Sequence, residues 1–442
     1  MSDPTTDSQT NYVKWFRNSA PYINAHRGKT FVLMLSGEAV AHSNFDNIVH
    51  DIALLNSLGV RLVLVHGARP QIEERVVQAG LQSRFHRDLR ITDEREIRCV
   101  TDATGSLRSH IEALLSMGVA NSPMHGAFIR VSSGNFVTAR PLGILDGVDY
   151  KHTGVVRRID AQGLQQQLHQ GQIVILSPLG YSPTGEIFNL TAEDVAVHTA
   201  RALQADKLIL FTAEEGLLNN QGELIEQCEY RDVDTLVAKN TTLGSDTIVQ
   251  AAVNAGDLGI QRCHLISYRE DGALLSELFT RDGAGTLITQ EHFEHLHTAS
   301  IDDVGGILAI IEPLEQQGVL LKRSRELLET EIEHFKVLEQ DGMIIACAAL
   351  YPYPEQRSGE IACVATHPDY RGADRAERLL AELEKAAAKQ GLNQVFVLTT
   401  QTAHWFQEQG YVECPVDDLP PAKRELYNCQ RNSKAFIKTL AS

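Results

Sequence analysis

The chain has 442 residues, 43% apolar and 22% charged, which is the composition of a globular protein of two or three domains. Its formal net charge of −17 argues against a nucleic-acid or anionic-membrane partner, because either would require a basic face. Seven cysteines without a Cys-x-x-Cys pair, a polar start and no apolar run near the roughly 20 residues of a membrane span predict a cytoplasmic protein.

The first predicted element is a helix over residues 11–23. Its aromatic and apolar side chains gather on one face: Tyr12, Trp15, Phe16, Tyr22 and Ile23. Such a stripe needs a partner that buries it. The partner is either the domain that follows or a neighbouring subunit, and the sequence leaves both open.

From Thr30 to Thr289, short apolar strands alternate with helical stretches. The predicted strands are 31–35, 61–65, 173–177, 207–212 and 263–267; the helices between them include 44–58, 70–79, 192–203 and 245–255. This alternation predicts a largely parallel sheet covered by helices on both faces. Ligands of such sheets bind at the carboxyl ends of the strands.

Three segments of this region resemble the amino-acid kinase superfamily, and most closely N-acetylglutamate kinase: Phe31–Gly37, Val65–Pro70 and Asn189–Glu193. Each departs from the kinase pattern. Met34 stands where those kinases carry the lysine that neutralises the transferring phosphoryl group, and Ala68-Arg69 replaces two glycines of a phosphate loop. Glu193 replaces an aspartate. The resemblance therefore implies, after an N-terminal helix segment over 1–27, a three-layer kinase-like domain over 28–291 without kinase chemistry.

The end of this domain, Ser276–Thr286, resembles the arginine-binding segment of arginine-sensitive members of the same superfamily. The resemblance implies an allosteric L-arginine site made by Glu277, Arg281, Asp282, Gly283, Gly285 and Thr286. Glu277 could pair with a guanidinium, and the glycines would let backbone groups approach the amino-acid head. A plain glycine turn before a last strand is the alternative.

The composition changes near residue 292, and the sequence predicts a solvated linker over 292–299. His292, His295 and His297 lie there without a convincing ligand set, so no metal site is predicted. A smaller mixed α+β domain is expected over 300–442. Its predicted elements are a hairpin turning at Asp341-Gly342, a strand at 360–365, a helix at 374–390, a strand at 394–400, a helix at 403–409 and a strand at 411–414.

One stretch of the second domain predicts an anion site. A strand breaks at His367-Pro368 and is followed by an arginine turn and a helix start, whose free N–H groups suit phosphate. Residues 364–376 resemble the acetyl-CoA pyrophosphate loop of the GNAT acetyltransferases. The loop residues implied are Arg371, Gly372, Ala373, Asp374, Arg375 and Ala376; the implied pantetheine contacts are the backbone of Cys363, Val364 and Ala365. Asp374 stands where glycine is usual and places an acid beside the phosphates.

A degenerate amino-acid kinase domain followed by a GNAT domain is the order of the bacterial N-acetylglutamate synthase family. The resemblance implies acetyl transfer from acetyl-CoA to L-glutamate, the first step of L-arginine biosynthesis, with feedback inhibition by L-arginine, no metal, and a homo-oligomer, a hexamer as in the family. It also assigns roles. Glu360 is the expected general base, and Thr399 is the expected acid, with a water as the alternative. Arg323, Lys423, Arg431 and Ser433 are the expected glutamate contacts.

Three other functions stay open at this point. N-acetylglutamate kinase activity would be favoured by a lysine at position 34, and Met34 speaks against it. A non-catalytic arginine sensor would follow if Asp374 cripples the coenzyme loop. A GNAT enzyme acting on another amine is disfavoured for cationic substrates by the basic side chains of Arg323, Lys423 and Arg431.

Overall fold

The computed structural model describes residues 13, 16–17, 19–118, 123–219, 221–237, 246–280, 283–290, 294–340, 342–371, 374–425, 427 and 433–440. The chain divides into two compact units, Met1–His292 and Phe293–Ser442. Each unit is treated by itself below.

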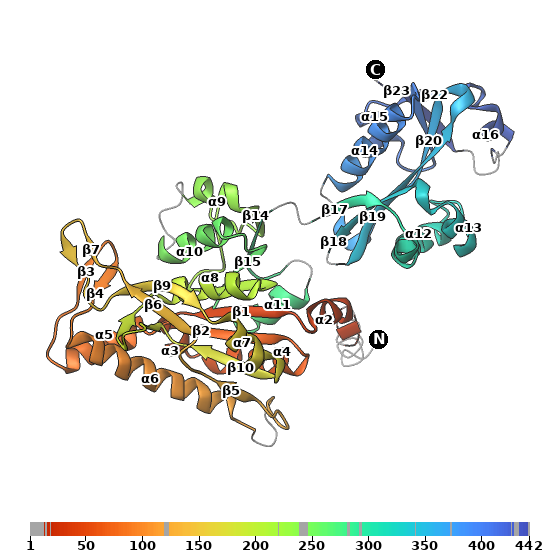
Figure 1. Ribbon diagram of the computed structural model, residues 1–442. Coiled ribbons are helices and arrows are strands. Elements are labelled where there is room, and N and C mark those ends of the chain that lie inside the picture. Colours follow the sequence, from red (N-terminus) through yellow and green to blue (C-terminus); the bar gives the residue numbers. More distant parts are fainter. Residues whose placement is uncertain are drawn as a thin grey trace. The chain divides into compact units, whose positions relative to one another are not determined.

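The first unit is built on an eight-stranded sheet (Figure 1) with the order β14-β16-β15-β13-β1-β2-β10-β5. Every neighbouring pair is parallel except β15 with β16. The strands are β1 Thr30–Leu35, β2 Arg61–His66, β5 Arg130–Ser132, β10 Gln172–Leu176, β13 Lys207–Thr212, β14 Gln227–Glu229, β15 Arg262–Ser267 and β16 Thr286–Thr289. The predicted parallel sheet is confirmed.

Two separate cores explain why β1 is a continuous apolar run rather than an alternating one. Val32 and Met34 pack on one face of the sheet, whereas Phe31, Leu33 and Leu35 pack on the other. A strand buried on both faces gains from apolar side chains at every position. The result is the three-layer arrangement expected from the sequence.

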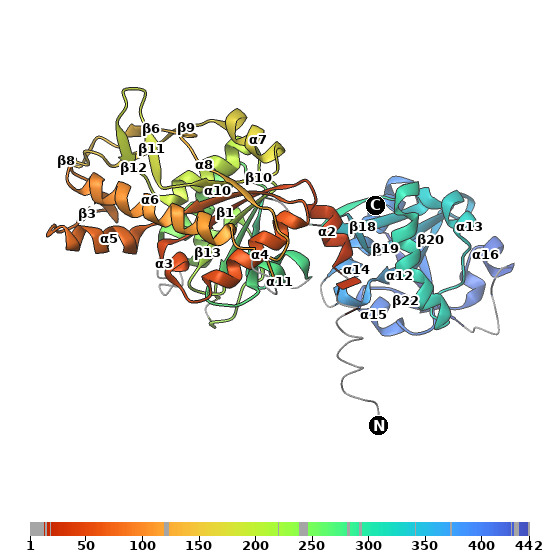
Figure 2. The ribbon, with the colours of Figure 1, turned by 90° about the horizontal axis from the view of Figure 1, so that it is seen from below.

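Helices cover both faces of this sheet. Side chains of α7, α8 and α10 join the core of Val32, and those of α3, α4, α5, α6 and α11 join the core of Phe31. In Figure 2, α4 and α6 lie on the near side of β1. The helices are α2 Ala20–His26, α3 Gly37–Ala41, α4 Phe45–Ser57, α5 Arg69–Gln78, α6 Glu96–Leu115, α7 Ala161–His169, α8 Ala192–Leu203, α9 Tyr230–Val237, α10 Asp246–Asp257 and α11 Ala273–Phe279.

A second, four-stranded sheet with the order β12-β11-β6-β9 lies among these elements. Its strands and those of two short hairpins are β6 Val137–Pro141, β9 Gly154–Ile159, β11 Leu179–Tyr181, β12 Ile187–Asn189, β3 Arg84–His86 with β4 Leu89–Ile91, and β7 Ile144–Leu145 with β8 Val148–Asp149. The sequence did not predict these strands or the long helix α6.

Part of the N-terminal stripe packs on its own unit. Tyr22 and Ile23, on α2, lie against the core of Phe31, and the buried His26 ring hydrogen-bonds the carbonyl of Leu278 at 2.8 Å. Phe16 remains 56% exposed. Tyr12 and Trp15 lie outside the described residues.

The second unit contains a seven-stranded sheet with the order β17-β18-β19-β20-β21-β23-β22. All pairs are antiparallel except β20 with β21. Its strands are β17 His295–Thr298, β18 Phe335–Gln340, β19 Met343–Tyr353, β20 Ser358–Thr366, β21 Gln394–Thr399, β22 Val412–Cys414 and β23 Lys434–Thr439. The predicted mixed α+β fold is confirmed.

Helices also cover both faces of the second sheet. Leu379, Leu380 and Leu383 of α14 pack on one face, while Ile307 and Ile311 of α12 pack on the other. The helices are α12 Val304–Gln316, α13 Arg325–Thr330, α14 Arg375–Lys389, α15 Ala403–Glu408 and α16 Pro421–Glu425. Within the described residues, no helix combines the length and apolarity that crossing a bilayer would need.

The prediction of a linker over 292–299 is wrong for residues 295–298. Residues 295–298 form β17, an edge strand that pairs antiparallel with β18. Its side chains are only partly buried, so it lacks the strict apolar alternation by which a half-buried strand is recognised. His297 lies 3.4 Å from the carboxylate of Asp303, and His292 lies outside the described residues.

Candidate active site

The second sheet carries a buried acid, Glu360, near the start of β20. It lies opposite Tyr351 of β19 in the ladder and is 7% exposed. Its Oε1 atom is 2.6 Å from Nζ of Lys423, which comes from α16, and its Oε2 atom is 3.4 Å from the hydroxyl of Tyr353. The structure therefore brings the predicted base and one predicted substrate cation into direct contact.

Strands β20 and β21 diverge immediately after this acid. They pair in parallel only through Ser358, Gly359 and Glu360, although β20 continues to Thr366 and β21 to Thr399. Parallel strands that separate leave unpaired backbone groups along the inner edges of the opening. Such an opening can admit an extended ligand that hydrogen-bonds to the backbone, as the sequence expects for pantetheine.

A β-bulge lies at the opening. The register of β19 and β20 passes from Ala349–Ala362 to Cys347–Ala365, so Cys363 and Val364 are set against a single residue of β19. Cys363 has φ +54°, in the left-handed region that non-glycine residues rarely adopt. Bulges of this kind change the direction of backbone groups, and this one lies where the acetyl carbonyl is expected.

The Cys363 side chain does not have the properties of a nucleophile. It is buried, and burial raises the pKa of its thiol to about 11. A thiol with that pKa is protonated at neutral pH, whereas nucleophilic cysteines react as thiolates. The geometry fits direct acetyl transfer rather than an acetyl-cysteine intermediate.

The predicted coenzyme loop follows β20. Arg371 is exposed, and Asp374 is the exposed residue at the N-cap of α14; Gly372 and Ala373 lie outside the described residues. Arg375 donates to the carbonyl of Tyr370 at 2.8 Å and to the carboxylate of Glu294 at 2.5 Å. Ala376 follows in the first turn of α14.

Glu294 holds a second arginine of this helix, because Arg378 also donates to its carboxylate. Glu294 is 11% exposed and immediately precedes β17. A chain segment predicted as linker thus supplies the anion that anchors the beginning of α14.

Arg323 lies between α12 and α13, close to the bulge. Its backbone N–H donates to the carboxylate of Glu315 at 2.9 Å. Burial opposes its charge, yet the neighbouring Cys363 and Tyr351 raise the pKa of the guanidinium overall. Tyr351 itself donates to Glu331 at 2.7 Å. The guanidinium therefore lies on the part of the sheet where the acid and the bulge are found.

Thr399 ends β21 on the other arm of the opening. Its Oγ1 atom accepts the backbone N–H of Thr402 at 3.0 Å and shares a hydrogen bond with the Thr402 hydroxyl at 2.8 Å. Ser433 is buried just before β23, and its carbonyl accepts the Tyr427 hydroxyl at 2.7 Å. Arg431 lies outside the described residues.

Sequence reasoning missed three side chains of this site: Tyr351, Tyr353 and Glu331. The two tyrosines alternate at i and i+2 at the end of a long apolar strand, so they share the sheet face of Glu360. This i, i+2 spacing can be read from the sequence and would have predicted that both tyrosines lie on the face of Glu360. Glu331, which follows α13, reaches the site only through the tertiary fold.

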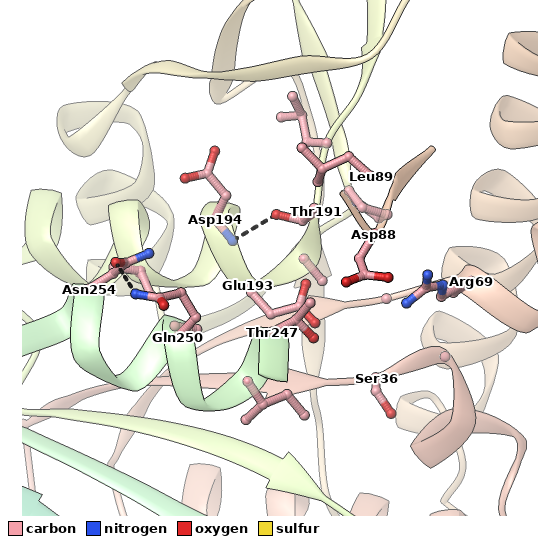
Figure 3. A pocket seen from close by; sticks show the side chains of 18 of the residues that line it. Ser36, Arg69, Asp88, Leu89, Thr191, Glu193, Asp194, Thr247, Gln250 and Asn254 are labelled. Carbon is pink, nitrogen blue, oxygen red and sulfur yellow. Dashed lines mark hydrogen bonds between the residues drawn. The ribbon is translucent and has the colours of Figure 1, made fainter. Parts of the chain in front are cut away.

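The first unit contains a cavity of about 1,030 Å³ at the carboxyl ends of its strands (Figure 3). Ser36, Arg69 and Glu193 are among its lining residues, and burial raises the pKa of Glu193. Met34 is fully buried in the core below. Consequently the end of β1 contributes no ammonium group to the cavity where a kinase would need one.

The predicted arginine segment surrounds Glu277 of α11. The Glu277 carboxylate is 2.5 Å from His264 Nδ1 and accepts the N–H groups of Ala284 at 2.8 Å and Gly285 at 3.0 Å. Burial opposes its charge, but the hydrogen bond with His264 brings the pKa of Glu277 below its ordinary value. The buried Glu277 carboxylate thus fixes the backbone of this loop at Ala284 and Gly285.

Two other described members of that segment, Gly283 and Thr286, differ in their placement. Gly283 has φ +69°, and a Cβ there would lie 2.6 Å from the Glu277 carboxylate. The hydroxyl of the buried Thr286 accepts the N–H of Leu217 at 2.8 Å. Arg281 and Asp282 lie outside the described residues.

Comparison with known proteins agrees with this two-unit architecture. Residues 29–267 match the amino acid kinase family, and residues 331–413 match the acetyltransferase (GNAT) domain. An amino-acid acetyltransferase of Ectopseudomonas mendocina (strain ymp) is 58% identical over 429 residues, covering 97% of this chain and 99% of the relative. One of Azotobacter vinelandii is 58% identical over 432 residues, with the same coverage.

Among solved structures, N-acetylglutamate synthase of Neisseria gonorrhoeae complexed with coenzyme A and L-arginine is 37% identical. The match covers 98% of this chain and 100% of that one, with a TM-score of 0.88. The same enzyme complexed with coenzyme A and N-acetyl-glutamate matches with 38% identity, the same coverage and a TM-score of 0.62.

Proposed function

The chain belongs to the amino-acid acetyltransferase family, and on this premise we propose that it transfers the acetyl group of acetyl-CoA to the amine of L-glutamate. The observation that carries the proposal is the buried acid Glu360 beside the opening between β20 and β21. The relative that was solved with coenzyme A and N-acetyl-glutamate supports the choice of both substrates.

The proposed reaction is a direct transfer. Glu360 accepts a proton of the glutamate ammonium, directly or through a water, and the free amine attacks the thioester carbonyl. The new C–N bond forms as the C–S bond breaks. The departing CoA thiolate takes a proton from Thr399 or from a water, that donor regains a proton from the amide nitrogen, and the proton held by Glu360 leaves to solvent.

The coenzyme is held, in this proposal, by two parts of the same unit. The backbone of Cys363, Val364 and Ala365 contacts pantetheine and polarises the acetyl carbonyl. The loop from Arg371 to Ala376 binds the pyrophosphate at the start of α14, where free N–H groups and the helix dipole favour an anion. The carboxylates of glutamate meet Arg323, Lys423, Arg431 and Ser433.

We further propose that the first unit, residues 28–291 after an N-terminal segment 1–27, is a regulatory kinase fold without kinase chemistry. Met34 and the lack of a lysine at the end of β1 support this view. L-arginine would bind at the segment 277–286 and inhibit the acetyltransferase, as the Neisseria gonorrhoeae complex with L-arginine suggests. We propose a homo-oligomer, hexameric by family resemblance, which light scattering can test.

The test is free-thiol release from acetyl-CoA with L-glutamate, repeated with millimolar L-arginine and again with ATP and N-acetylglutamate. We expect release that requires glutamate and falls with arginine. Release that ignores arginine would contradict the regulatory site and keep the enzyme. ADP formation without thiol release would contradict the whole proposal and assign the chemistry to the first unit.

A further inference from the structure

The proposed base is not free in this structure. Lys423 Nζ lies 2.6 Å from Oε1 of Glu360, and the Tyr353 hydroxyl lies 3.4 Å from Oε2. The two charged side chains are only 15% and 9% exposed. Both oxygens of the base therefore have a partner, and the closer partner is an ammonium that cannot accept a proton. We call the base masked in this state, because the Lys423 ammonium occupies the oxygen that would accept the substrate's proton.

Lys423 is well placed to move. It lies in α16, a helix of five residues whose four other residues are partly or fully exposed. Its ammonium stands on a flexible four-carbon stem, so a change of rotamer carries the charge several ångströms without backbone motion. Glu360, in contrast, is fixed on a strand with neighbours on both sides.

A carboxylate of the substrate offers the Lys423 ammonium an alternative ion-pair partner. Moving this mostly buried ammonium off Glu360 with no new partner leaves two buried charges unpaired, which is strongly unfavourable. A bound substrate avoids that loss, because its carboxylate pairs with Lys423 while its ammonium takes the place of Lys423 beside Glu360. The exchange is open only to a substrate with a carboxylate within reach of Lys423.

We propose that Lys423 is a positioning residue that masks Glu360 until a carboxylate of a dicarboxylic amino acid draws its ammonium away. The inference rests on the proposed function, since it takes Glu360 as the base. Masking of Glu360 would make the enzyme select its substrate through kcat as well as through KM. An amino acid that lacks the required carboxylate can bind and still leave the base blocked by Lys423.

The test compares L-glutamate with its two mono-amides, L-glutamine and L-isoglutamine, each of which lacks one carboxylate charge. The variants are Lys423→Met, Lys423→Gln and the conservative Lys423→Arg. Free-thiol release at saturating acetyl-CoA gives kcat and KM for each amino acid, and thermal melting shows whether each variant is folded.

For the wild type, we expect kcat with one of the two amides to be at least about tenfold below kcat with glutamate, because a general base contributes about 10²- to 10⁴-fold and a masked base loses part of that contribution. In Lys423→Met and Lys423→Gln, that kcat ratio should shrink to within about threefold while KM for glutamate rises. Lys423→Arg, which keeps the positive charge, should keep the wild-type kcat ratio. The matched control is Lys434→Met, which removes a lysine from an exposed pair with Glu413 and should leave the ratio unchanged.

A purely structural pair would behave differently. If Lys423→Met and Lys423→Gln fold but keep the wild-type kcat ratio, or lose kcat equally with all three amino acids, the masking role is overturned. Equal kcat of the wild type with all three amino acids overturns it as well. A wild type without any glutamate-dependent thiol release contradicts the proposed function itself, which separates that failure from the failure of the mask.

Discussion

At the scale of single residues, the site depends on which groups can carry a proton or a charge. Glu360 is buried, acidic and set beside the strand opening, whereas the nearby Cys363 is kept protonated by burial, with a pKa of about 11. The two side chains therefore suit different tasks. Glu360 can accept a proton, and Cys363 is proposed to contribute only its backbone.

Replacing Glu360 by glutamine tests the base directly. Glu360→Gln should lower kcat by about 10²- to 10⁴-fold, because the amide keeps the shape of the side chain but cannot accept the proton. Steady-state thiol release is the measurement. Tyr353→Phe is the control and should change kcat less than about threefold, since its 3.4 Å hydrogen bond to Glu360 is long. A kcat of Glu360→Gln within tenfold of the wild type would contradict the role.

A second residue-scale prediction concerns stability and pH. His66 is fully buried, with Nδ1 3.1 Å from the carbonyl of Gly67 and Nε2 2.9 Å from the Ser177 hydroxyl. Burial lowers the pKa of His66 to about 4, and Arg108 acts in the same direction. The unfolded chain, with a histidine pKa near 6.5, binds more protons below that pH. This group therefore makes stability fall as the pH drops from about 6.5 toward 4.

Between pH 7 and 5, this histidine should remove about 2 kcal/mol of unfolding free energy from the wild type. His66→Gln lacks the titrating group. The stability difference between wild type and variant should therefore shrink by that amount over the same interval. Denaturant unfolding of both proteins at the two pH values provides the measurement. A difference that stays constant would show that His66 is not the group involved.

At the scale of elements, β20 and α14 together form the proposed coenzyme site. The bulge at Cys363 and the early end of pairing with β21 open the sheet, and the loop that follows delivers the start of α14. Arg375 and Arg378 of that helix are anchored on Glu294. The loop is thus held by a carboxylate that lies some 80 residues earlier in the chain.

Glu294→Gln should lower the free energy of unfolding by about 1–3 kcal/mol, because two partly buried guanidinium groups lose their anion. The KM for acetyl-CoA should rise, because the beginning of α14 loses its anchor. Melting curves and thiol-release kinetics are the measurements. Glu413→Gln, which breaks the exposed pair with Lys434, is the matched control and should cost at most about 1 kcal/mol. Wild-type stability and KM in Glu294→Gln would refute the anchor.

At the scale of the whole molecule, the chain joins an acetyltransferase unit to a kinase fold that lacks a lysine at the end of β1. The predicted fold class and the predicted activity class are confirmed. The role of the first unit is a proposal, and it requires that a ligand bound in one unit alter turnover in the other. Such coupling can be measured by changing one unit and assaying the other.

Glu277→Gln is the variant for that measurement. The amide cannot serve both His264 and the N–H groups of Ala284 and Gly285 as the carboxylate does, so the arginine segment should lose its shape. We expect inhibition by millimolar L-arginine to disappear while kcat without arginine stays within about twofold, because the reacting groups are in the other unit. Glu214→Gln, at an exposed acid of the same unit, should keep full inhibition. Inhibition retained by Glu277→Gln would contradict the predicted site.

The order of the domains and most central strands could be predicted from the sequence, and Glu360 could be proposed as the base, because these inferences depend on local apolar periodicity and on motifs that lie in one stretch of chain. Only the tertiary structure decided what surrounds them. The edge strand β17 has too little burial to leave a pattern, and the strands of the small sheet of the first unit have only three to six residues each, too few for a clear alternation.

The same holds for the contacts on which the proposals depend. Lys423 reaches Glu360 across 63 residues in the chain numbering, and Glu294 reaches Arg375 across 81. An ion pair across such a separation leaves no periodic trace in sequence, because it depends on how loops and helices pack around the sheet. Sequence reasoning proposed the reacting groups, and the fold decided which of them are paired.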